Sequence, residues 1–189
     1  MKSSISMKRF FEVTRFLWAR SPPTIGALEE VLGTTILGVL PPTRCLIHRV
    51  GADGKEGTAY RILSSNLALA MEARQCKCIG LIPAGKRSSE PVIGLNMATA
   101  FANQGRRVLM IDLSGEFSGL HLLLDVNPGR GLTNDFSGGV PFPKVIQKTQ
   151  LPGIDVITAG SWASKGDSID ELRDLRACLN SLSDQYHVY

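Results

Sequence analysis

The chain has 189 residues, of which 43% are apolar and 20% charged, and its formal net charge is +4. This composition is typical of one ordinary globular domain, and four cysteines without a paired pattern exclude a disulfide framework. No apolar run reaches the ~18 residues of a membrane-spanning helix, and no signal peptide is recognisable. We therefore expect a cytoplasmic protein. Cys76 and Cys78 lack a second Cys/His cluster, so no metal site is expected, and neither is a nucleic-acid partner.

Residues 1–23 form a basic N-terminal segment that ends in Ser21-Pro22-Pro23. It has five positively charged residues and one acidic residue, Glu12. The positively charged residues are Lys2, Lys8, Arg9, Arg15 and Arg20. Such a segment could lie next to a membrane, where each positive charge near anionic lipid contributes ~1 kcal/mol. It could equally be a solvated and partly disordered leader.

The first predicted elements precede residue 75. Residues 24–32 are expected to form a short helix that ends at Gly33, and residues 35–40 form a strand candidate. A polar loop is expected over residues 43–55. From residue 58 to 74 the apolar spacing predicts an amphipathic helix.

From residue 78 onward, short apolar strands alternate with helices. Strands are predicted at 78–82, 107–112 and 153–160, and helices at 90–104 and 168–183, the first closed by Gly105. Uninterrupted apolar strands alternating with helices predict an α/β fold: a mainly parallel, twisted sheet with helices on both faces. Residues 185–189 look like the start of one more strand, so we expect the sheet to be incomplete at one edge.

Several short motifs follow one another along the chain in a specific order. They are Leu37-Gly38-Val39-Leu40-Pro41, Tyr60-Arg61-x-Leu63, Asn96-Met97-Ala98, Gly105-Arg106-Arg107-Val108-Leu109-Met110-Ile111-Asp112, Gly131-Leu132-Thr133 and Val156-Ile157-Thr158-Ala159-Gly160. Over residues 24–189 the chain resembles the cytoplasmic P-loop domain of bacterial polysaccharide-export tyrosine autokinases (BY-kinases). The resemblance implies ATP and Mg²⁺ binding, phosphorylation of a C-terminal tyrosine cluster between subunits, and ring assembly. It also implies a membrane chain-length regulator as partner, in capsule and exopolysaccharide synthesis and export, at the inner face of the bacterial inner membrane.

The phosphate-binding loop departs from the family pattern. With Asn96 as the anchor, the family's Gly-Lys-Ser-Thr falls on Ser89-Glu90-Pro91-Val92. The lysine that should neutralise phosphate is therefore Glu90, and the hydroxyl that should ligate Mg²⁺ is Pro91. A carboxylate at a helix N-terminus stabilises the helix by ~0.3–1 kcal/mol and repels an anion. Ser89 is a good N-cap. This segment is suited to start a helix and not to hold ATP.

A displaced anion site is the alternative for this loop. Gly85, Lys86, Ser88 and Ser89 could present an ammonium group, hydroxyls and amides to a phosphate out of register. The other interpretation is a surface loop with solvated charges. No cofactor is expected, although ATP and Mg²⁺ would be required if the chain were an active kinase.

Asp112 is the candidate catalytic residue. The family's strand ends in Asp-x-Asp with a basic residue nearby, and here Ser114 replaces the second aspartate and Glu116 the basic residue. Asp112 follows a parallel strand, where open α/β sheets place their sites. Its alternative role is to cap the next turn.

Arg61 is the candidate interface residue. The family's ring-forming helix carries Glu-x-x-Arg-x-x-Arg, and the corresponding positions are Thr58, Arg61 and Ser64. Arg61 could bridge to another copy of the chain, but ring assembly through this helix is in doubt. The chain also stops at Tyr189, before the family's third acidic motif and its tyrosine-rich tail.

The sequence therefore predicts a degenerate and inactive homologue of the autokinase domain, which acts as a regulatory binding partner of a membrane chain-length regulator. One alternative is an active, divergent autokinase in which Lys86 and Asp112 retain their roles. A weaker alternative is a relative of the partition-type ATPases.

Overall fold

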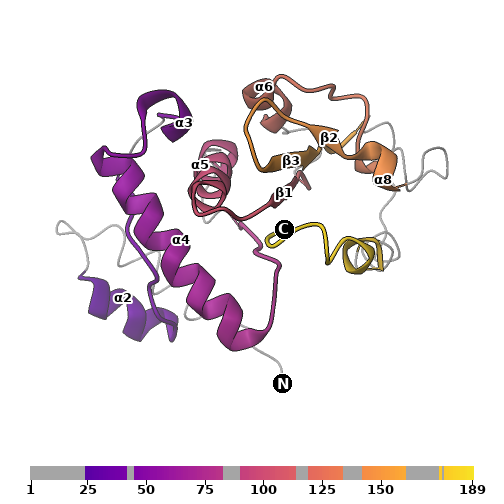
Figure 1. Ribbon diagram of the computed structural model, residues 1–189. Coiled ribbons are helices and arrows are strands. Elements are labelled where there is room, and N and C mark those ends of the chain that lie inside the picture. The colour runs from indigo at the N-terminus through magenta and orange to yellow at the C-terminus, as the bar shows by residue number, and fades with distance from the viewer. Residues whose placement is uncertain are drawn as a thin grey trace. The chain divides into compact units, whose positions relative to one another are not determined.

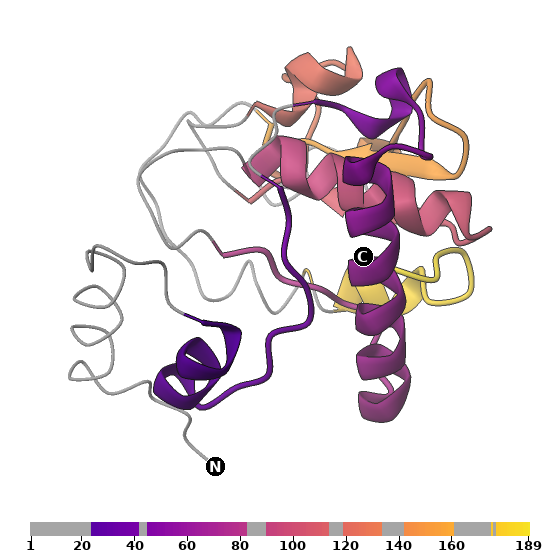
Figure 2. The same cartoon turned by 90° about the vertical axis from the view of Figure 1, so that its left-hand side faces the viewer.

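The computed structural model describes residues 24–41, 45–82, 90–113, 119–133, 142–160, 175 and 177–189 (Figures 1 and 2). The chain divides into two compact units, residues 1–39 and 40–189. The basic segment 1–23 lies outside the described residues, so the roles predicted for it stay predictions. Within the described part of the chain, no helix is both long and apolar enough to cross a membrane.

The first unit contains one described helix, α2 (Ile25–Leu32), as the sequence predicted. Thr24 caps it by accepting a hydrogen bond from the Ala27 N–H at 3.3 Å, and Gly33 ends it in the left-handed conformation with φ 63°. The strand predicted over residues 35–40 is wrong, because the structure assigns no strand to this segment. Its apolar residues favour an extended chain, yet a strand needs a neighbour, and the Ile36 N–H instead donates to the Glu29 carboxylate at 2.8 Å.

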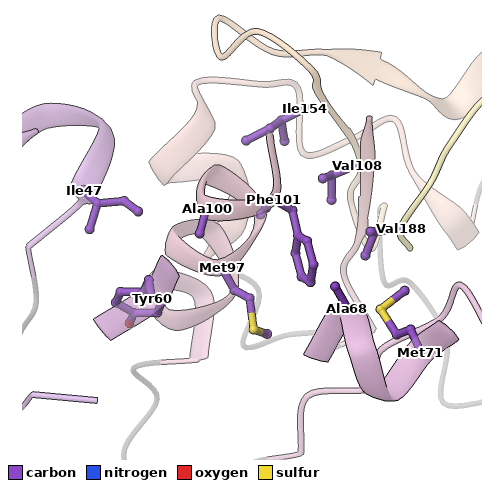
Figure 3. Packing of buried hydrophobic residues seen from close by; sticks show 11 residues of the cluster. Ile47, Tyr60, Ala68, Met71, Met97, Ala100, Phe101, Val108, Ile154 and Val188 are labelled. Carbon is purple, nitrogen blue, oxygen red and sulfur yellow. The ribbon is translucent and has the colours of Figure 1, made fainter. Parts of the chain in front are cut away.

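Two long helices form one side of the second unit. Helix α4 (Lys55–Arg74) and helix α5 (Glu90–Asn103) begin and end close to their predicted bounds. Figure 2 shows that they cross. Figure 3 shows the apolar contact, where Tyr60 and Met71 of α4 meet Met97 and Phe101 of α5. The predicted loop 43–55 is wrong in part, because residues Ile47–Val50 form the short helix α3, which packs on α5.

The described sheet has the strand order β1-β3-β2. Strand β1 (Val108–Ile111) is parallel to β3 (Ile154–Ile157), as the continuous apolar runs predicted. The two-residue strand β2 (Gln147–Lys148) is antiparallel to β3 and was not predicted, because its polar residues carry no strand pattern. The sheet is therefore mixed.

Alternate residues of β1 face different helices. Val108 packs with α4 and α5, whereas Leu109 packs with residues from the C-terminal helical turn and from α8 (Phe142–Val145). The short helix α6 (Leu120–Leu124) packs near α5 on the first side. Helices thus cover both faces, and the predicted α/β fold is confirmed. Of the predicted helix 168–183, the described residues Leu175 and 177–181 are helical.

The C-terminal residues 187–189 lie inside the sheet. Five backbone hydrogen bonds hold them. The N–H groups of His187 (2.9 Å) and Val188 (3.3 Å) donate to Arg107 O, and Leu109 N donates to Val188 O (3.0 Å). On the other side, Tyr189 N donates to Lys77 O (2.8 Å) and Ile79 N to Tyr189 O (3.0 Å). Residues 187–189 therefore run parallel to β1 and lie between β1 and residues 77–79. The predicted strand 78–82 is extended and is paired only at its start, so the structure assigns no strand there.

Candidate functional site

The carboxyl end of the parallel strands carries the one predicted catalytic side chain. Asp112 directly follows β1, is only 7% exposed, and its N–H donates to the Ile157 carbonyl at 2.9 Å. This bond extends the β1–β3 ladder by one residue, so the Asp112 backbone is held at the sheet end where open α/β sheets bind ligands. The position agrees with the sequence analysis, and the catalytic role stays a prediction.

The start of α5 lies at the same end of the sheet. Gly94, in the first half of α5, lies beside Met110 late in β1, whereas Ala102 near the end of α5 lies beside Gly153, which precedes β3. Helix α5 is therefore antiparallel to the strands, and its N-terminus points toward the end where Asp112 lies. This is the arrangement of a phosphate-binding helix.

The first residues of this helix are where the sequence departs from the family's phosphate-binding motif. Helix α5 begins at Glu90, with Pro91 in its first turn. Proline has no N–H, so one donor that could face a phosphate is missing, and in the family register Glu90 takes the position of the lysine. The candidate loop residues Gly85, Lys86, Ser88 and Ser89 lie outside the described residues, and their anion-binding role stays a prediction. No group of three or more His, Cys, Asp or Glu side chains in the described ranges could hold a metal.

A second segment, residues 127–133, borders this end of the sheet. The N–H of Leu132 donates to the Thr158 carbonyl at 2.9 Å, and the Thr158 hydroxyl donates to the Arg130 carbonyl at 3.0 Å. Gly131 lies so close to β3 that an added Cβ would be 2.2 Å from the Thr158 carbonyl oxygen. The glycine of the Gly-Leu-Thr motif is thus required by backbone packing.

Gln147 fixes the other end of that segment. Its amide nitrogen donates to the carbonyls of Asn127 (2.8 Å) and Arg130 (2.7 Å), while its amide oxygen accepts the Asn127 N–H at 3.0 Å. Three bonds from one side chain therefore tie β2 to the segment 127–133. These contacts order the loop and supply no acid, base or nucleophile.

The candidate interface residue Arg61 is exposed on α4, and no described residue forms an ion pair with it. Ser64, three residues later, is fully buried and accepts a hydrogen bond from the Gln104 amide at 2.8 Å. The position aligned with the family's last interface arginine therefore faces α5. The interface role of Arg61 stays a prediction.

Asn96, which sets the register of the family motif in the sequence, has a structural role. It is fully buried; its side-chain oxygen accepts the Ile47 N–H at 2.9 Å, and its nitrogen donates to the Cys45 carbonyl at 2.8 Å. The side chain thus joins α5 to the start of α3. An amide side chain in the middle of the mainly apolar helix α5 was the available signal.

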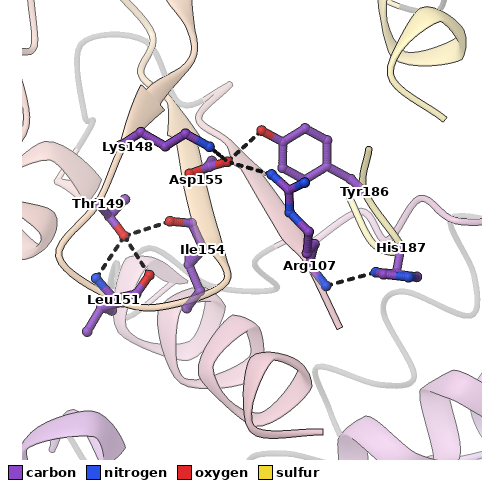
Figure 4. A network of polar contacts seen from close by, with 8 residues as sticks. All are labelled: Arg107, Lys148, Thr149, Leu151, Ile154, Asp155, Tyr186 and His187. Carbon is purple, nitrogen blue, oxygen red and sulfur yellow. Dashed lines mark hydrogen bonds and ion pairs between the residues drawn. The ribbon is translucent and has the colours of Figure 1, made fainter. Parts of the chain in front are cut away.

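Asp155 forms a second buried polar cluster that the sequence analysis missed (Figure 4). It is 6% exposed in β3, and its Oδ2 accepts from the Tyr186 hydroxyl at 2.6 Å and from Lys148 Nζ at 2.7 Å, with Arg107 Nη2 at 3.6 Å. Burial raises the pKa of Tyr186 well above its usual range, and the adjacent Asp155 carboxylate raises it further. A charged residue within the apolar stretch Ile154–Ile157 was the signal for this cluster.

The cluster connects the C-terminal residues to the sheet. Tyr186 precedes the paired residues 187–189, and Arg107 lies over its ring, 5.1 Å from the centroid. The Arg107 N–H also donates to His187 Nδ1 at 2.9 Å. The cluster lies near the beginning of β1 and β3, away from Asp112, so it acts on placement of the C-terminal residues and not on the candidate site.

Comparison with curated proteins finds tyrosine kinases. The chain is 24% identical over 131 residues to tyrosine-protein kinase ptk of Acinetobacter johnsonii, which covers 69% of this chain and 18% of that protein. It is 27% identical over 101 residues to tyrosine-protein kinase YwqD of Bacillus subtilis, which covers 53% of this chain and 43% of that protein. The chain thus spans less than half the length of either relative. No protein-family model matches it.

Comparison with solved structures gives the same family of folds. The chimerical protein CapA2B2 superposes with a TM-score of 0.74 at 20% identity, covering 87% of this chain and 73% of that one. The kinase domain of Escherichia coli tyrosine kinase ETK superposes with a TM-score of 0.74 at 21% identity, covering 87% and 70%. These likenesses confirm the expected resemblance to bacterial tyrosine kinase domains and their P-loop α/β fold.

Proposed function

We propose, from its likeness to bacterial tyrosine kinases, that this chain is a degenerate autokinase domain which acts by binding in capsule or exopolysaccharide synthesis and export. Its partner would be a membrane chain-length regulator at the inner face of the bacterial inner membrane. One observation carries the proposal: α5 begins with Glu90 and Pro91 at the position where the fold presents a helix N-terminus to phosphate.

The charge and the number of hydrogen-bond donors at the start of α5 both oppose phosphate binding. A kinase neutralises the charge of the transferred phosphate with lysine and Mg²⁺. Here the aligned lysine is Glu90, which adds a negative charge, and Pro91 removes both a hydroxyl and an N–H. Loss of the lysine, the hydroxyl and an amide donor opposes nucleotide binding at the same point.

The interface argument supports a binding role without a ring. Of the three aligned interface positions on α4, only Arg61 retains a charge, and Ser64 is buried against Gln104. Thr58 and Ser64 therefore cannot supply the charges of reciprocal ion pairs with a neighbouring subunit. A role as a partner for a different protein is more consistent with this surface than a closed ring of identical subunits.

Calorimetric titration of the chain with Mg²⁺-ATP and with Mg²⁺-ADP tests the proposal. We expect no heat of binding at millimolar nucleotide, with the E. coli ETK kinase domain as the positive control. Lys86→Ala tests the displaced anion site, and Lys144→Ala, which changes a lysine on α8, is its matched control. Micromolar binding that Lys86→Ala abolishes and Lys144→Ala preserves would contradict the proposal.

The partner is tested separately by co-purification. The chain, carrying an affinity tag, is expected to retain the chain-length regulator encoded in the same bacterium when membranes are solubilised in mild detergent. Failure to retain it, while a tagged active kinase does so under the same conditions, would refute the binding role without bearing on nucleotide loss.

The active, divergent autokinase remains the second candidate because Asp112 is retained and buried at the carboxyl end of β1. In that case ATP and Mg²⁺ would be cofactors, and Asp112→Asn would abolish binding and self-phosphorylation. The same titration separates the two candidates.

A further inference from the structure

The four-residue helix α3 depends on contacts outside itself. Its own backbone hydrogen bonds run from the N–H groups of Arg49 (2.9 Å) and Val50 (3.2 Å) to the Leu46 carbonyl, and from Gly51 to the Ile47 carbonyl (3.0 Å). The N-cap residue Leu46 has no polar side chain with which to cap the helix. Because an isolated helix this short is not stable in water, α3 requires its docking on α5.

Two kinds of contact hold α3 in place. Asn96 of α5 accepts a hydrogen bond from the Ile47 N–H (2.9 Å) and donates one to the Cys45 carbonyl (2.8 Å). The Ile47 side chain is buried in the apolar cluster that contains Tyr60 and Ala100 (Figure 3). The hydrogen bonds of Asn96 are separate from the β-sheet ladder, so α3 can open locally while the ladder stays intact.

His48 of α3 has an unpaired buried nitrogen. Its side chain is half-buried, and within the described ranges its Nδ1 is buried without a hydrogen-bond partner. While the imidazole is neutral, the docked state lacks one hydrogen bond that water would otherwise make. In the imidazolium both ring nitrogens carry an N–H, so a buried donor on a positive ring would lack an acceptor. Burying an unpaired charge costs far more than burying an unpaired neutral group.

The surroundings of His48 also oppose its protonation. Burial lowers the pKa of His48 below its usual range, and the positive charge of Arg49 lowers it further. The elements that share apolar clusters with Leu46 and Ile47 are α4, α5, α6, β1 and β3. Their titratable side chains are Lys55, Glu56, Tyr60, Arg61, Glu72 and Arg74 on α4, Glu90 on α5, His121 on α6 and Asp155 on β3. Among the described residues no carboxylate raises the pKa of His48, so protonation favours a released state in which the ring is solvated.

We propose that residues 45–51 form an acid-sensitive latch, in which protonation of His48 releases α3 from α5 and leaves Asn96 without its partners. At pH 7.5 the imidazole is neutral and the latch is docked. As the pH falls below about 6.5, the value for a solvated histidine, the released state binds the proton more tightly than the docked state and gains population. Acid conditions thereby expose the buried apolar side chains of Leu46 and Ile47. Nucleotide plays no part in the latch, so it does not depend on the kinase likeness.

Amide hydrogen exchange of the isotope-labelled 189-residue chain, followed by NMR at pH 7.5 and pH 5.5, tests the latch. The measured quantity is the protection factor, which corrects for the intrinsic pH dependence of exchange. We expect the protection factors of the Ile47 and Gly51 amides to fall by ~3–10-fold, because pH 5.5 lies about one unit below the value for a solvated histidine. The Val108 amide, which donates to the Gly153 carbonyl at 2.8 Å in the sheet, should change by less than about 2-fold.

Variants separate His48 from other titrating groups. His48→Leu removes the titrating ring and should abolish the pH dependence at Ile47 and Gly51. If that variant does not fold, His48→Asn, which keeps a neutral polar side chain, replaces it with the same expected result. His121→Asn is the matched control: it removes a histidine from α6, which packs on the same helix α5, and should leave the pH dependence unchanged. Asn96→Ala is the positive control for release and should lower the protection of Ile47 already at pH 7.5.

Three results would overturn the proposal. The first is a protection factor of Ile47 that is equal at the two pH values. The second is an equal fall at Val108, which would mean that acid unfolds the whole unit. The third is a pH dependence at Ile47 that survives in the His48 variant or disappears in His121→Asn, because another group would then be responsible.

Discussion

Replacing Tyr186 with phenylalanine should lower the free energy of unfolding by ~1.5–2 kcal/mol at neutral pH. The change removes one oxygen, whose hydrogen donates to the Asp155 carboxylate at 2.6 Å. A hydrogen bond to a charged group contributes ~1.5–3 kcal/mol. We expect the lower part of that range because Asp155 still accepts from Lys148 at 2.7 Å. Water cannot easily replace the lost donor, since Tyr186 is 3% exposed.

Urea unfolding at pH 7.5, with a thiol reductant for the free cysteines, measures this loss. Tyr189→Phe is the matched control, because it removes the same atom from a second tyrosine three residues away. The Tyr189 hydroxyl donates to the neutral Leu179 carbonyl at 3.2 Å and is less buried. Its removal should cost only ~0.5–1 kcal/mol.

The same pair of variants tests the pKa of Tyr186, which burial and Asp155 raise above the usual value of 10.0. A raised pKa of an acidic group means that the folded state keeps its proton longer than the unfolded state does. The stabilisation is then complete below pH 10 and is lost as the pH rises above it, by up to ~1.4 kcal/mol per pH unit. The difference in unfolding free energy between the native chain and Tyr186→Phe should therefore shrink above pH 10.

Two results would refute this reasoning. One is an equal loss of stability in Tyr186→Phe and Tyr189→Phe, which would mean that the charge of Asp155 contributes nothing. The other is a difference in unfolding free energy between the native chain and Tyr186→Phe that stays constant from pH 8 to 11.5. This would mean that the pKa of Tyr186 is not raised.

Three further predictions follow from other buried contacts. Asn96→Ala should lower the free energy of unfolding, measured by urea unfolding, by ~2–4 kcal/mol, because the Ile47 N–H and the Cys45 carbonyl lose their partner. A loss below about 1 kcal/mol would mean that water replaces the Asn96 side chain. Gly131→Ala should cost more than ~2 kcal/mol because its Cβ would be 2.2 Å from a backbone oxygen, whereas Gly26→Ala in α2 should be neutral or stabilising; equal effects would contradict the packing argument. Lys148→Ala should cost at most ~1 kcal/mol, since that side chain is 76% exposed, and the loss should diminish in 1 M NaCl; a salt-independent loss would point to packing.

Local patterns predicted the elements whose cause lies within a few residues. Helix α2 has its Thr24 cap and Gly33 terminator next to it in the sequence, and α4 and α5 carry their own apolar faces. The strands β1 and β3 were predicted from continuous apolar runs. The strand prediction for residues 35–40 was wrong because its cause is not local. The segment has the apolar pattern of a strand, but a strand also needs a neighbouring strand, which no local pattern specifies.

The candidate site also combines features with a local cause and features that depend on tertiary contacts. Sequence by itself determined that Asp112 follows a buried strand and that Glu90 and Pro91 begin the helix before that strand, because position along the chain settles both. Only the tertiary structure decided that residues 187–189 lie between residues 77–79 and β1, and that Asp155 meets Tyr186. These contacts join residues separated by 31 or more positions, and the hydrogen bonds and burial that select them exist only when the sheet is formed.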